Sequence, residues 1–441
     1  MDFVANKKPQ IKEMLAYLGL NRIEELFADI PHELLLPPPT SDDGLSEFEG
    51  LRELEKIADK NRFHRFESYL GGGAYEHHIP SIASAICQKS EFLTAYTPYQ
   101  AEISQGTLQA IFEFQSAICA LTGLDVSNAS VYDGASACAE AVLMALRAKP
   151  GRNKILISDS LNPMYRAVID LYTENKGVDI VTFRGPVDSR YFDEDIAAVL
   201  VQSPNFFGSI EEIEKIFSLG SGVGALNILC ADPLSFGLYK SASELGADIA
   251  VGDCQPLGIP LQYGGPYAGY MACRKELMRL LPGRIVGETR DISGKRGFVL
   301  TLQVREQHIR REKSTSNICT NQALCALSSV VTMFWYGPEG IKQLALTNFQ
   351  KSSYLKNALK NIPGIVLVNK EETFNEFVIR CSVPLKDVFA YFRERNIEPG
   401  INLHQYFPEY ENCLLIAATE TKNKEQLDRY IAIMKEIFIG K

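Results

Sequence analysis

The chain has 441 residues, of which 46% are hydrophobic and 22% are charged, and its formal net charge at pH 7 is −9. This length predicts two or three domains, and the near-average numbers of glycine (32) and proline (21) exclude collagen-like and disordered chains. The acidic balance argues against a nucleic-acid-binding protein, which usually carries a basic footprint.

The N-terminal sequence and the cysteines indicate the compartment. No long apolar segment follows Met1, and the longest apolar stretch, 323–336, is too short to span a bilayer and predicts a buried helix. The ten cysteines are scattered, form no C-x-x-C pair and have no histidine at metal-ligand spacing. We therefore expect a cytoplasmic protein without a metal site that binds neither membranes nor nucleic acids.

Residues 1–65 are predicted to form a helical and extended arm rather than an independent core. Apolar residues recur with the 3.6-residue period of a helix in 10–27. A second helix is expected at 46–61, where Ser46 and Glu49 stand at the spacing of a capping box.

Residues 66–334 are predicted to form a large α/β domain. Short β-branched runs alternate with helical stretches, and the strands are almost continuously apolar, which indicates a mainly parallel, doubly wound sheet with helices on both faces. Strands are expected at 129–132, 154–158, 179–183, 197–202, 226–231, 248–251 and 268–273, and helices at 135–148, 163–175 and 210–219.

Residues 335–441 are predicted to form a small α+β domain. Its composition shifts to short apolar runs and amphipathic stretches. Strands are expected at 364–368, 376–380 and 413–417, and helices at 385–395 and 424–439.

Two features mark the carboxyl edge of the predicted large sheet. Gly134, Ala135 and Ser136 open the helix after the first strand, so their backbone N–H groups can approach an anion that the helix dipole favours. A strand-to-helix turn often carries glycine and a serine cap, so a structural interpretation is also open. Asp232 follows the strand at 226–231 and either pairs with a protonated ring nitrogen of a ligand or caps the next segment.

A phosphate-binding turn, a strand-end aspartate and a later post-strand turn, in this order, resemble the fold-type-I pyridoxal phosphate enzymes. Four segments narrow the resemblance to the glycine cleavage system P-protein family, and within it to the N-terminal-half chain of organisms that divide the protein into two subunits. These segments are 69–75 (YLGGGAY), 92–106 (FLTAYTPYQAEISQG), 305–313 (REQHIRREK) and 315–320 (TSNICT).

The resemblance implies decarboxylation of glycine with transfer of the aminomethyl group to the lipoyl group of H-protein. In the family, a lysine forms a Schiff base with pyridoxal phosphate; here its position falls on Gln255, whose amide cannot form an imine. Neither Lys240 nor Lys275 is placed to replace it. We therefore expect no catalytic residue and no covalently held cofactor on this chain, and pyridoxal phosphate on the partner. The turn and strand-end residues are then vestigial or shared: Gly134, Ala135, Ser136 and Asp232.

The expected partners are the lysine-bearing P-protein subunit 2, with one or two copies of each chain, and the lipoylated H-protein. Tyrosines in a proline-containing loop can wall a pocket, and amides can bind a small amino acid. The candidates for reaching the partner's site are Tyr96, Tyr99, Gln100, Thr315, Ser316 and Asn317. Basic residues just before Thr315 either steer an acidic protein or form ion pairs within the chain. The alternative function is a non-catalytic scaffold or regulatory paralogue that binds the lysine-bearing subunit or H-protein.

Overall fold

The computed structural model describes residues 6–36, 44–95, 98–185, 187–303, 307–314 and 316–440, without the side chain of His308. Two of the candidate residues, Tyr96 and Thr315, lie outside this set. The chain divides into two compact units, Met1–His64 and Arg65–Lys441.

The first unit contains short helices. They are α1 (Lys8–Tyr17), the 3-10 turns η1 (Ile23–Phe27) and η2 (His32–Leu34), and α2 (Glu47–Ala58). The capping box predicted at the start of α2 is confirmed: the Glu49 N–H donates to Ser46 Oγ at 3.4 Å, and the Ser46 N–H donates to Glu49 Oε2 at 3.0 Å. These two bonds satisfy amides that a helix start otherwise leaves unpaired.

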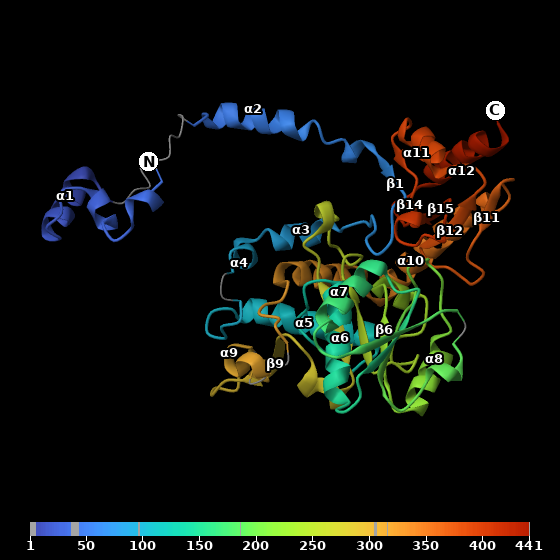
Figure 1. The fold of residues 1–441 in the computed structure, drawn as a ribbon, viewed down its shortest axis with the longest axis horizontal. Helices are drawn as coiled ribbons and strands as arrows, with labels where there is room; N and C mark the ends of the chain where they lie inside the picture. Colours follow the sequence, from blue (N-terminus) through green and yellow to red (C-terminus); the bar gives the residue numbers. More distant parts are fainter. Residues whose placement is uncertain are drawn as a thin grey trace. The chain divides into compact units, whose positions relative to one another are not determined.

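The second unit is built on a seven-stranded sheet with the order β2-β8-β7-β6-β5-β3-β4. Its central strand β6 is labelled in Figure 1. Neighbouring strands from β7 to β4 pair in parallel, whereas β8 is antiparallel to β7, and β2 is antiparallel to β8. The strands are β2 (Val126–Ser127), β3 (Lys154–Ser158), β4 (Asp179–Phe183), β5 (Ile196–Gln202), β6 (Leu226–Cys230), β7 (Ile249–Asp253) and β8 (Gly269–Cys273). The predicted mainly parallel sheet is confirmed.

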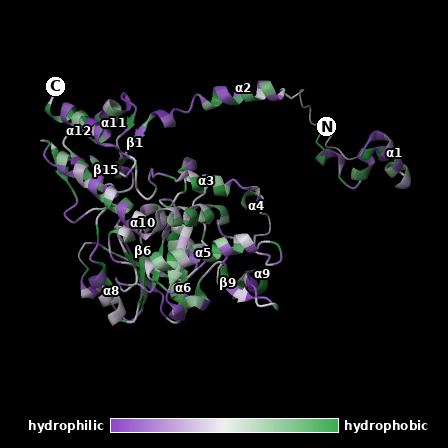
Figure 2. Ribbon diagram, turned by 180° about the vertical axis from the view of Figure 1, so that it is seen from behind, coloured by the Kyte–Doolittle hydropathy of each residue, from purple (hydrophilic) through white to green (hydrophobic). Residues whose placement is uncertain are grey.

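Helices cover both faces of this sheet. Side chains alternate along each strand, so Leu156 of β3 packs with one helical layer while Ile155 and Ile157 pack with the other. The first layer holds α5 (Gln105–Thr122), α8 (Ile213–Gly222) and α10 (Ala323–Leu359), and the second holds α6 (Gly134–Ala148) and α7 (Pro163–Thr173). Hydrophobic colouring in Figure 2 is concentrated on the central strands around β6.

The strand predicted at 129–132 is wrong. Only Val131 forms an isolated bridge there, to Gly269. The reason is local turn chemistry: the Ser130 N–H donates to Asn128 Oδ1 at 3.2 Å, and Ser130 adopts a φ of 98°, which breaks an extended run. The pairing strand is instead β2, just upstream.

Helix α10 was predicted to be buried over its apolar start, and this is only partly correct. Val330 and Met333 are buried, but Phe334 is 58% and Trp335 is 63% exposed, because a helix lying on a sheet buries only one stripe. The helix bends at Gly337, whose φ is 62°. Beyond the bend it continues from the large sheet to the core of the small one.

The C-terminal part forms a four-stranded antiparallel sheet with the order β11-β12-β15-β14. Its elements are β11 (Ile365–Leu367), β12 (Glu376–Cys381), α11 (Leu385–Arg393), β14 (Ile401–Asn402), β15 (Cys413–Ala417) and α12 (Lys424–Ile439). A short parallel pair joins β1 (Glu67–Ser68) to β13 (Ile397–Glu398), so the segment that follows β1 starts beside the small sheet.

Several short elements complete the second unit. They are α3 (Ser81–Cys87), α4 (Ser90–Leu93), η4 (Ser189–Tyr191), η5 (Pro233–Gly237), η6 (Gln262–Gly264), η7 (Lys275–Leu280), the hairpin strands β9 (Ile285–Arg290) and β10 (Arg296–Thr301), α9 (Gln307–Arg310), η9 (Arg311–Lys313) and η10 (Leu403–Gln405). The 3-10 turn η3 (Phe63–Arg65) spans the boundary between the two units. Across the described ranges, no helix combines the length and apolar character needed to cross a membrane.

Candidate functional site

A small cavity lies at the carboxyl ends of three parallel strands. Gln202 ends β5, Asp232 lies just beyond β6, and Asp253 ends β7; all three line the cavity, whose volume is about 30 Å³. That volume holds one or two water molecules, whereas ligand sites usually measure roughly 300–1,000 Å³. The part of the carboxyl edge formed by β5, β6 and β7 therefore leaves too little space for a cofactor-sized ligand.

The first turn of α6, predicted as a phosphate-binding turn, is occupied by carboxylates of the chain itself. Asp133 is the N-cap and accepts the Ser136 N–H at 2.7 Å. The Gly134 N–H donates to Asp253 Oδ2 at 2.9 Å. Ala135, between them, is buried at the second position of the helix. Two carboxyl groups of the chain thus stand where the helix dipole would attract an anionic ligand.

Asp253 is a buried carboxylate with two backbone donors. Besides the Gly134 N–H, it accepts the Gln255 N–H at 2.8 Å. Burial raises the pKa of Asp253 to about 7; the two N–H bonds oppose this shift, and repulsion from Asp133 and Asp232 adds to it. The sequence analysis assigned no role to this residue, although a carboxylate ending the strand beside the turn was a visible signal.

Gln255 is fully engaged in hydrogen bonds. Its Oε1 accepts the Tyr75 N–H at 2.9 Å, and its Nε2 donates to the Tyr75 carbonyl at 2.9 Å and the Ile259 carbonyl at 3.0 Å. The residue is 2% exposed. Both amide N–H donors and the acceptor are used, so Gln255 joins the post-strand turn to the segment around Tyr75 and is not available to a ligand.

Glu376 of β12 contacts the first two glycines of the triplet 71–73. Its Oε2 accepts the Gly72 N–H at 2.8 Å, and its Oε1 accepts the Tyr75 hydroxyl at 2.6 Å. A Cβ on Gly71 would lie 2.4 Å from Glu376 Oε2, so only glycine fits there. Burial raises the pKa of Glu376 to about 7, against the bonds from Tyr75 and Gly72. The sequence analysis used this triplet only as a family signature and missed Glu376.

Asp232 caps the segment that follows it. Its Oδ1 accepts the Leu234 N–H at 2.9 Å at the start of η5, and its Oδ2 accepts Asn375 Nδ2 at 3.3 Å. Burial raises the pKa of this carboxyl, and the charge of His77 opposes the shift. The sequence left two roles open for Asp232, pairing with a ligand's ring nitrogen or capping the next segment. Its contacts within the chain are those of a cap.

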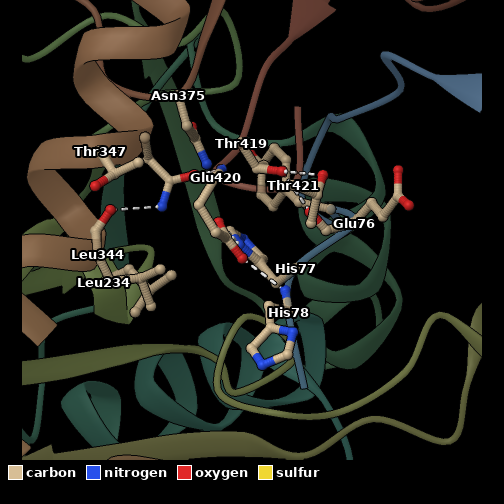
Figure 3. A network of polar contacts seen from close by, with 12 residues as sticks. Glu76, His77, His78, Leu234, Leu344, Thr347, Asn375, Thr419, Glu420 and Thr421 are labelled. Carbon is tan, nitrogen blue, oxygen red and sulfur yellow. Dashed lines mark hydrogen bonds and ion pairs between the residues drawn. The ribbon is translucent and has the colours of Figure 1, made fainter. Parts of the chain in front are cut away.

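His77 forms a buried ion pair with Glu420 (Figure 3). Its Nδ1 lies 2.9 Å from Glu420 Oε2, and the His78 N–H donates to Glu420 Oε1 at 2.6 Å. Burial disfavours the imidazolium, but the Glu420 carboxylate outweighs it and raises the pKa of His77. Burial likewise disfavours the charged carboxylate, yet His77 and the His78 N–H lower the pKa of Glu420 to about 2. The pair joins the segment after Tyr75 to the end of the small sheet.

Tyr99 and Gln100 differ in how the chain holds them. The Tyr99 hydroxyl bonds Thr320 Oγ1 at 2.7 Å and donates to Asn321 Oδ1, and the Arg284 guanidinium lies 3.9 Å from the centre of its ring. Gln100 is exposed, and its side chain has no hydrogen-bond partner among the residues that the structure describes. Tyr99 is thus fixed against the 320–321 segment, whereas Gln100 is available to a partner.

Ser316 and Asn317 also differ. Ser316 Oγ donates to Glu140 Oε1 at 2.7 Å and accepts the Ile318 N–H at 3.1 Å, which ties this segment to α6. Glu140 is 3% exposed, and burial raises its pKa while the bond from Ser316 lowers it. Asn317 is exposed. The structure therefore brings the 98–100 loop and the 316–321 segment together beside α6, away from the closed cavity's lining.

These observations define the class of protein: an α/β chain with the fold of the fold-type-I pyridoxal phosphate enzymes. The residues do not fit pyridoxal phosphate, because the cavity is too small, its described lining contains no lysine, and two carboxylates stand at the α6 N-terminus.

The chain belongs to the glycine cleavage system P-protein family, whose model matches residues 1–434. A relative from Protochlamydia amoebophila, "probable glycine dehydrogenase (decarboxylating) subunit 1", is 59% identical over 99% of this chain and 100% of its own length. A crystal structure of glycine decarboxylase (P-protein) of the glycine cleavage system, in inhibitor-bound form, matches with 41% identity and a TM-score of 0.91 over 99% of this chain and 100% of that one. A C-DES mutant with glycine covalently linked to its PLP cofactor shares the fold alone: 13% identity and a TM-score of 0.59, over 81% and 94% of the two chains.

Proposed function

We propose that this chain is the first of two subunits of a glycine decarboxylase, and that the second subunit carries the reactive lysine and binds pyridoxal phosphate. The single observation that carries the proposal is Gln255. The chain is 59% identical to a protein named subunit 1, and Gln255 stands at the position of the family's lysine. All hydrogen-bonding groups of its side chain are used by Tyr75 and Ile259. A site without an amine or a cavity needs a partner to supply both.

In the assembled enzyme, glycine loses carbon dioxide, and its aminomethyl group passes to a sulfur of the lipoyl disulfide of H-protein, which is thereby reduced. The chain described here contributes by shaping the partner's site. Gln100 and Asn317 are the described candidates with exposed polar side chains, and Tyr99 and Ser316 fix the two segments that carry them. Vestigial residues of the closed cavity take no part. The ten free cysteines support a reducing, cytoplasmic setting.

The purified chain tests this proposal. Alone, it should show no visible cofactor absorbance after incubation with pyridoxal phosphate, no borohydride-trapped adduct and no glycine–bicarbonate exchange. Addition of the lysine-bearing subunit should restore the absorbance and the exchange. A trapped adduct on this chain alone would overturn the proposal.

A non-catalytic scaffold is the competing function, and Gln100 distinguishes the two. Gln100→Ala should lower glycine–bicarbonate exchange by the assembled complex about tenfold or more without weakening assembly, because an interfacial hydrogen bond to a reacting ligand is lost. Gln109→Ala is the matched control, since this exposed glutamine bonds only Glu113 on its own helix. Unchanged exchange in the Gln100 variant, with Asn317→Ala also unchanged, would favour the scaffold.

The basic segment, defined as the described residues 284–303 and 307–314 and containing the β9–β10 hairpin, is our proposed docking surface for H-protein. From residue 284 to 314, the described residues include seven basic side chains against three acidic ones, in a chain whose net charge is −9. Ile292 is fully exposed at the tip of the β9–β10 hairpin. The Asp291 carboxylate accepts the Ser293 and Lys295 N–H groups, each at 2.8 Å, which orders this turn. Charge-rich surfaces of this kind suit a reversible, acidic partner better than a permanent interface.

A further inference from the structure

The N-terminus of α6 has a ligand that the chain supplies itself. A 15-residue helix presents unpaired first-turn amides and a partial positive charge, which together attract an anion. Here the Gly134 N–H donates to the Asp253 carboxylate, and the Ser136 N–H donates to Asp133. Asp133 is an ordinary N-cap from the preceding residue. Asp253 is different, because it comes from the end of β7, 119 residues further along the chain.

The backbone around Asp253 is shaped for this contact. Asp253 pairs with Gly269 in β8, and a Cβ on Gly269 would lie 2.2 Å from the Asp133 carbonyl oxygen. A Cβ on Gly134 would lie 2.4 Å from the Tyr165 hydroxyl and 3.0 Å from the Asp253 nitrogen. Because Gly134 and Gly269 have no side chains, the start of α6 and the end of β7 lie close enough for the Asp253 carboxylate to reach the Gly134 N–H. No space remains for a phosphate beside it.

Asp253 also connects to Gln255. Its second oxygen accepts the Gln255 N–H. The Gln255 side chain in turn accepts a hydrogen bond from the Tyr75 N–H and donates one to the Tyr75 carbonyl. The result is a continuous chain of hydrogen bonds from α6 through the post-strand turn to the segment 71–75. Each link is buried, and Asp253 and Tyr75 at its two ends line the 30 Å³ cavity.

We propose that the Asp253 carboxyl group is a built-in acceptor that occupies the α6 anion site from within the chain, and that Gln255 holds the site closed behind it. The inference deepens the proposed function, since it states why this subunit binds no phosphorylated cofactor. It follows that the absence of lysine at position 255 is not the only reason why this subunit does not bind the cofactor. Replacing Gln255 by lysine alone leaves the anion site filled, whereas removing the Asp253 carboxylate exposes the amides to inorganic phosphate.

Thermal unfolding of the full chain with inorganic phosphate as the probe tests the site directly. Phosphate should raise the Tm of Asp253→Ser by at least about 2 °C, because a ligand that binds only the folded state stabilises it. It should leave the wild type and Asp253→Asn unchanged, since the asparagine still fills the space. Asp232→Ser is the matched control: it removes a carboxylate from the same cavity but not from α6, and phosphate should not shift its Tm. A folded Asp253→Ser without a phosphate response would overturn the inference.

Two further measurements do not depend on the Tm response of that variant. In the wild type, about 50 mM phosphate should not slow hydrogen–deuterium exchange in residues 133–137, and protection there would overturn the inference. Gln255→Lys should give no borohydride-trapped adduct with pyridoxal phosphate, whereas Gln255→Lys combined with Asp253→Ser should give one; an adduct in the single variant contradicts the inference. Exchange activity of the wild-type complex with the second subunit is unaffected by any of these outcomes, so a failure of the inference is distinguishable from a failure of the proposed function.

Discussion

The Gln255 carboxamide and the Tyr75 backbone are paired in both directions: Gln255 Oε1 accepts the Tyr75 N–H, and Gln255 Nε2 donates to the Tyr75 carbonyl, each at 2.9 Å. This is the hydrogen-bond pattern of two paired backbone residues, reproduced by one side chain. A lysine at this position has no acceptor for the Tyr75 N–H, so the residue that removes the family's nucleophile also supplies a bond that lysine cannot make.

Gln255→Ala should lower the free energy of unfolding by about 2–5 kcal/mol. The change leaves the Tyr75 N–H and two carbonyls buried without partners, and each such group costs about 1–3 kcal/mol. Urea unfolding followed by circular dichroism measures the loss. Gln109→Ala, at an exposed position, should cost less than about 0.5 kcal/mol. Equal stability of the two variants would contradict the assigned role of Gln255.

Glu376 should make the protein less stable as the pH rises. Its pKa in the folded chain, about 7, lies above its ordinary value of 4.5, so the stabilisation is fully present below pH 4.5 and is lost as the pH rises through 7. Between pH 5.5 and 8.5, linkage predicts a loss of about 2 kcal/mol from this group. Glu376→Gln should remove that part of the pH dependence. Parallel pH profiles for the wild type and this variant would contradict the prediction.

The His77–Glu420 ion pair should stabilise the folded chain in a different pH range. The raised pKa of His77 gives stabilisation that is present below pH 6.5 and lost as the pH rises through the folded value. The pKa of Glu420, lowered to about 2, gives stabilisation that is present above pH 4.5 and lost as the pH falls towards 2. His77→Gln should therefore cost most between about pH 4.5 and 6.5, by about 3–5 kcal/mol, because it leaves a buried carboxylate unpaired.

His78→Gln is the matched control for that experiment. Its side chain is exposed, and only its backbone N–H contacts Glu420. Denaturant unfolding at pH 5.5 should show little change, within about 0.5 kcal/mol of the wild type. A loss as large as that of the His77 variant would show that the cost does not come from the ion pair.

The basic segment predicts a salt-sensitive interaction with H-protein. Lys295→Glu combined with Lys313→Glu should raise the KM for lipoylated H-protein about tenfold at low ionic strength, with a smaller effect at high salt, because exposed charges act through screened attraction. Ile292→Ser should raise KM at both salt concentrations, since its contact is apolar. Lys342→Glu, on the exposed surface of α10 beside Glu339, is the charge-matched control. An identical rise in the control would mean that the effect reflects net charge alone.

Most of the architecture followed from local patterns. Strands β3 and β4 and helix α12 have the predicted bounds, because continuous apolar runs and a 3.6-residue apolar period are properties of neighbouring residues. The error at 129–132 arose where an Asn128 side chain captured the Ser130 N–H, a competition that hydrophobicity does not show.

The sequence by itself determined the fold class, the family resemblance and the absence of lysine at position 255. Only the tertiary structure decided what the closed site is made of. Gly72 and Glu376 are 304 residues apart, Tyr75 and Gln255 are 180 apart, and Gly134 and Asp253 are 119 apart. Local periodicity specifies which face of an element is buried, but the partner of a buried carboxylate or amide depends on which strand ends the folded sheet brings together.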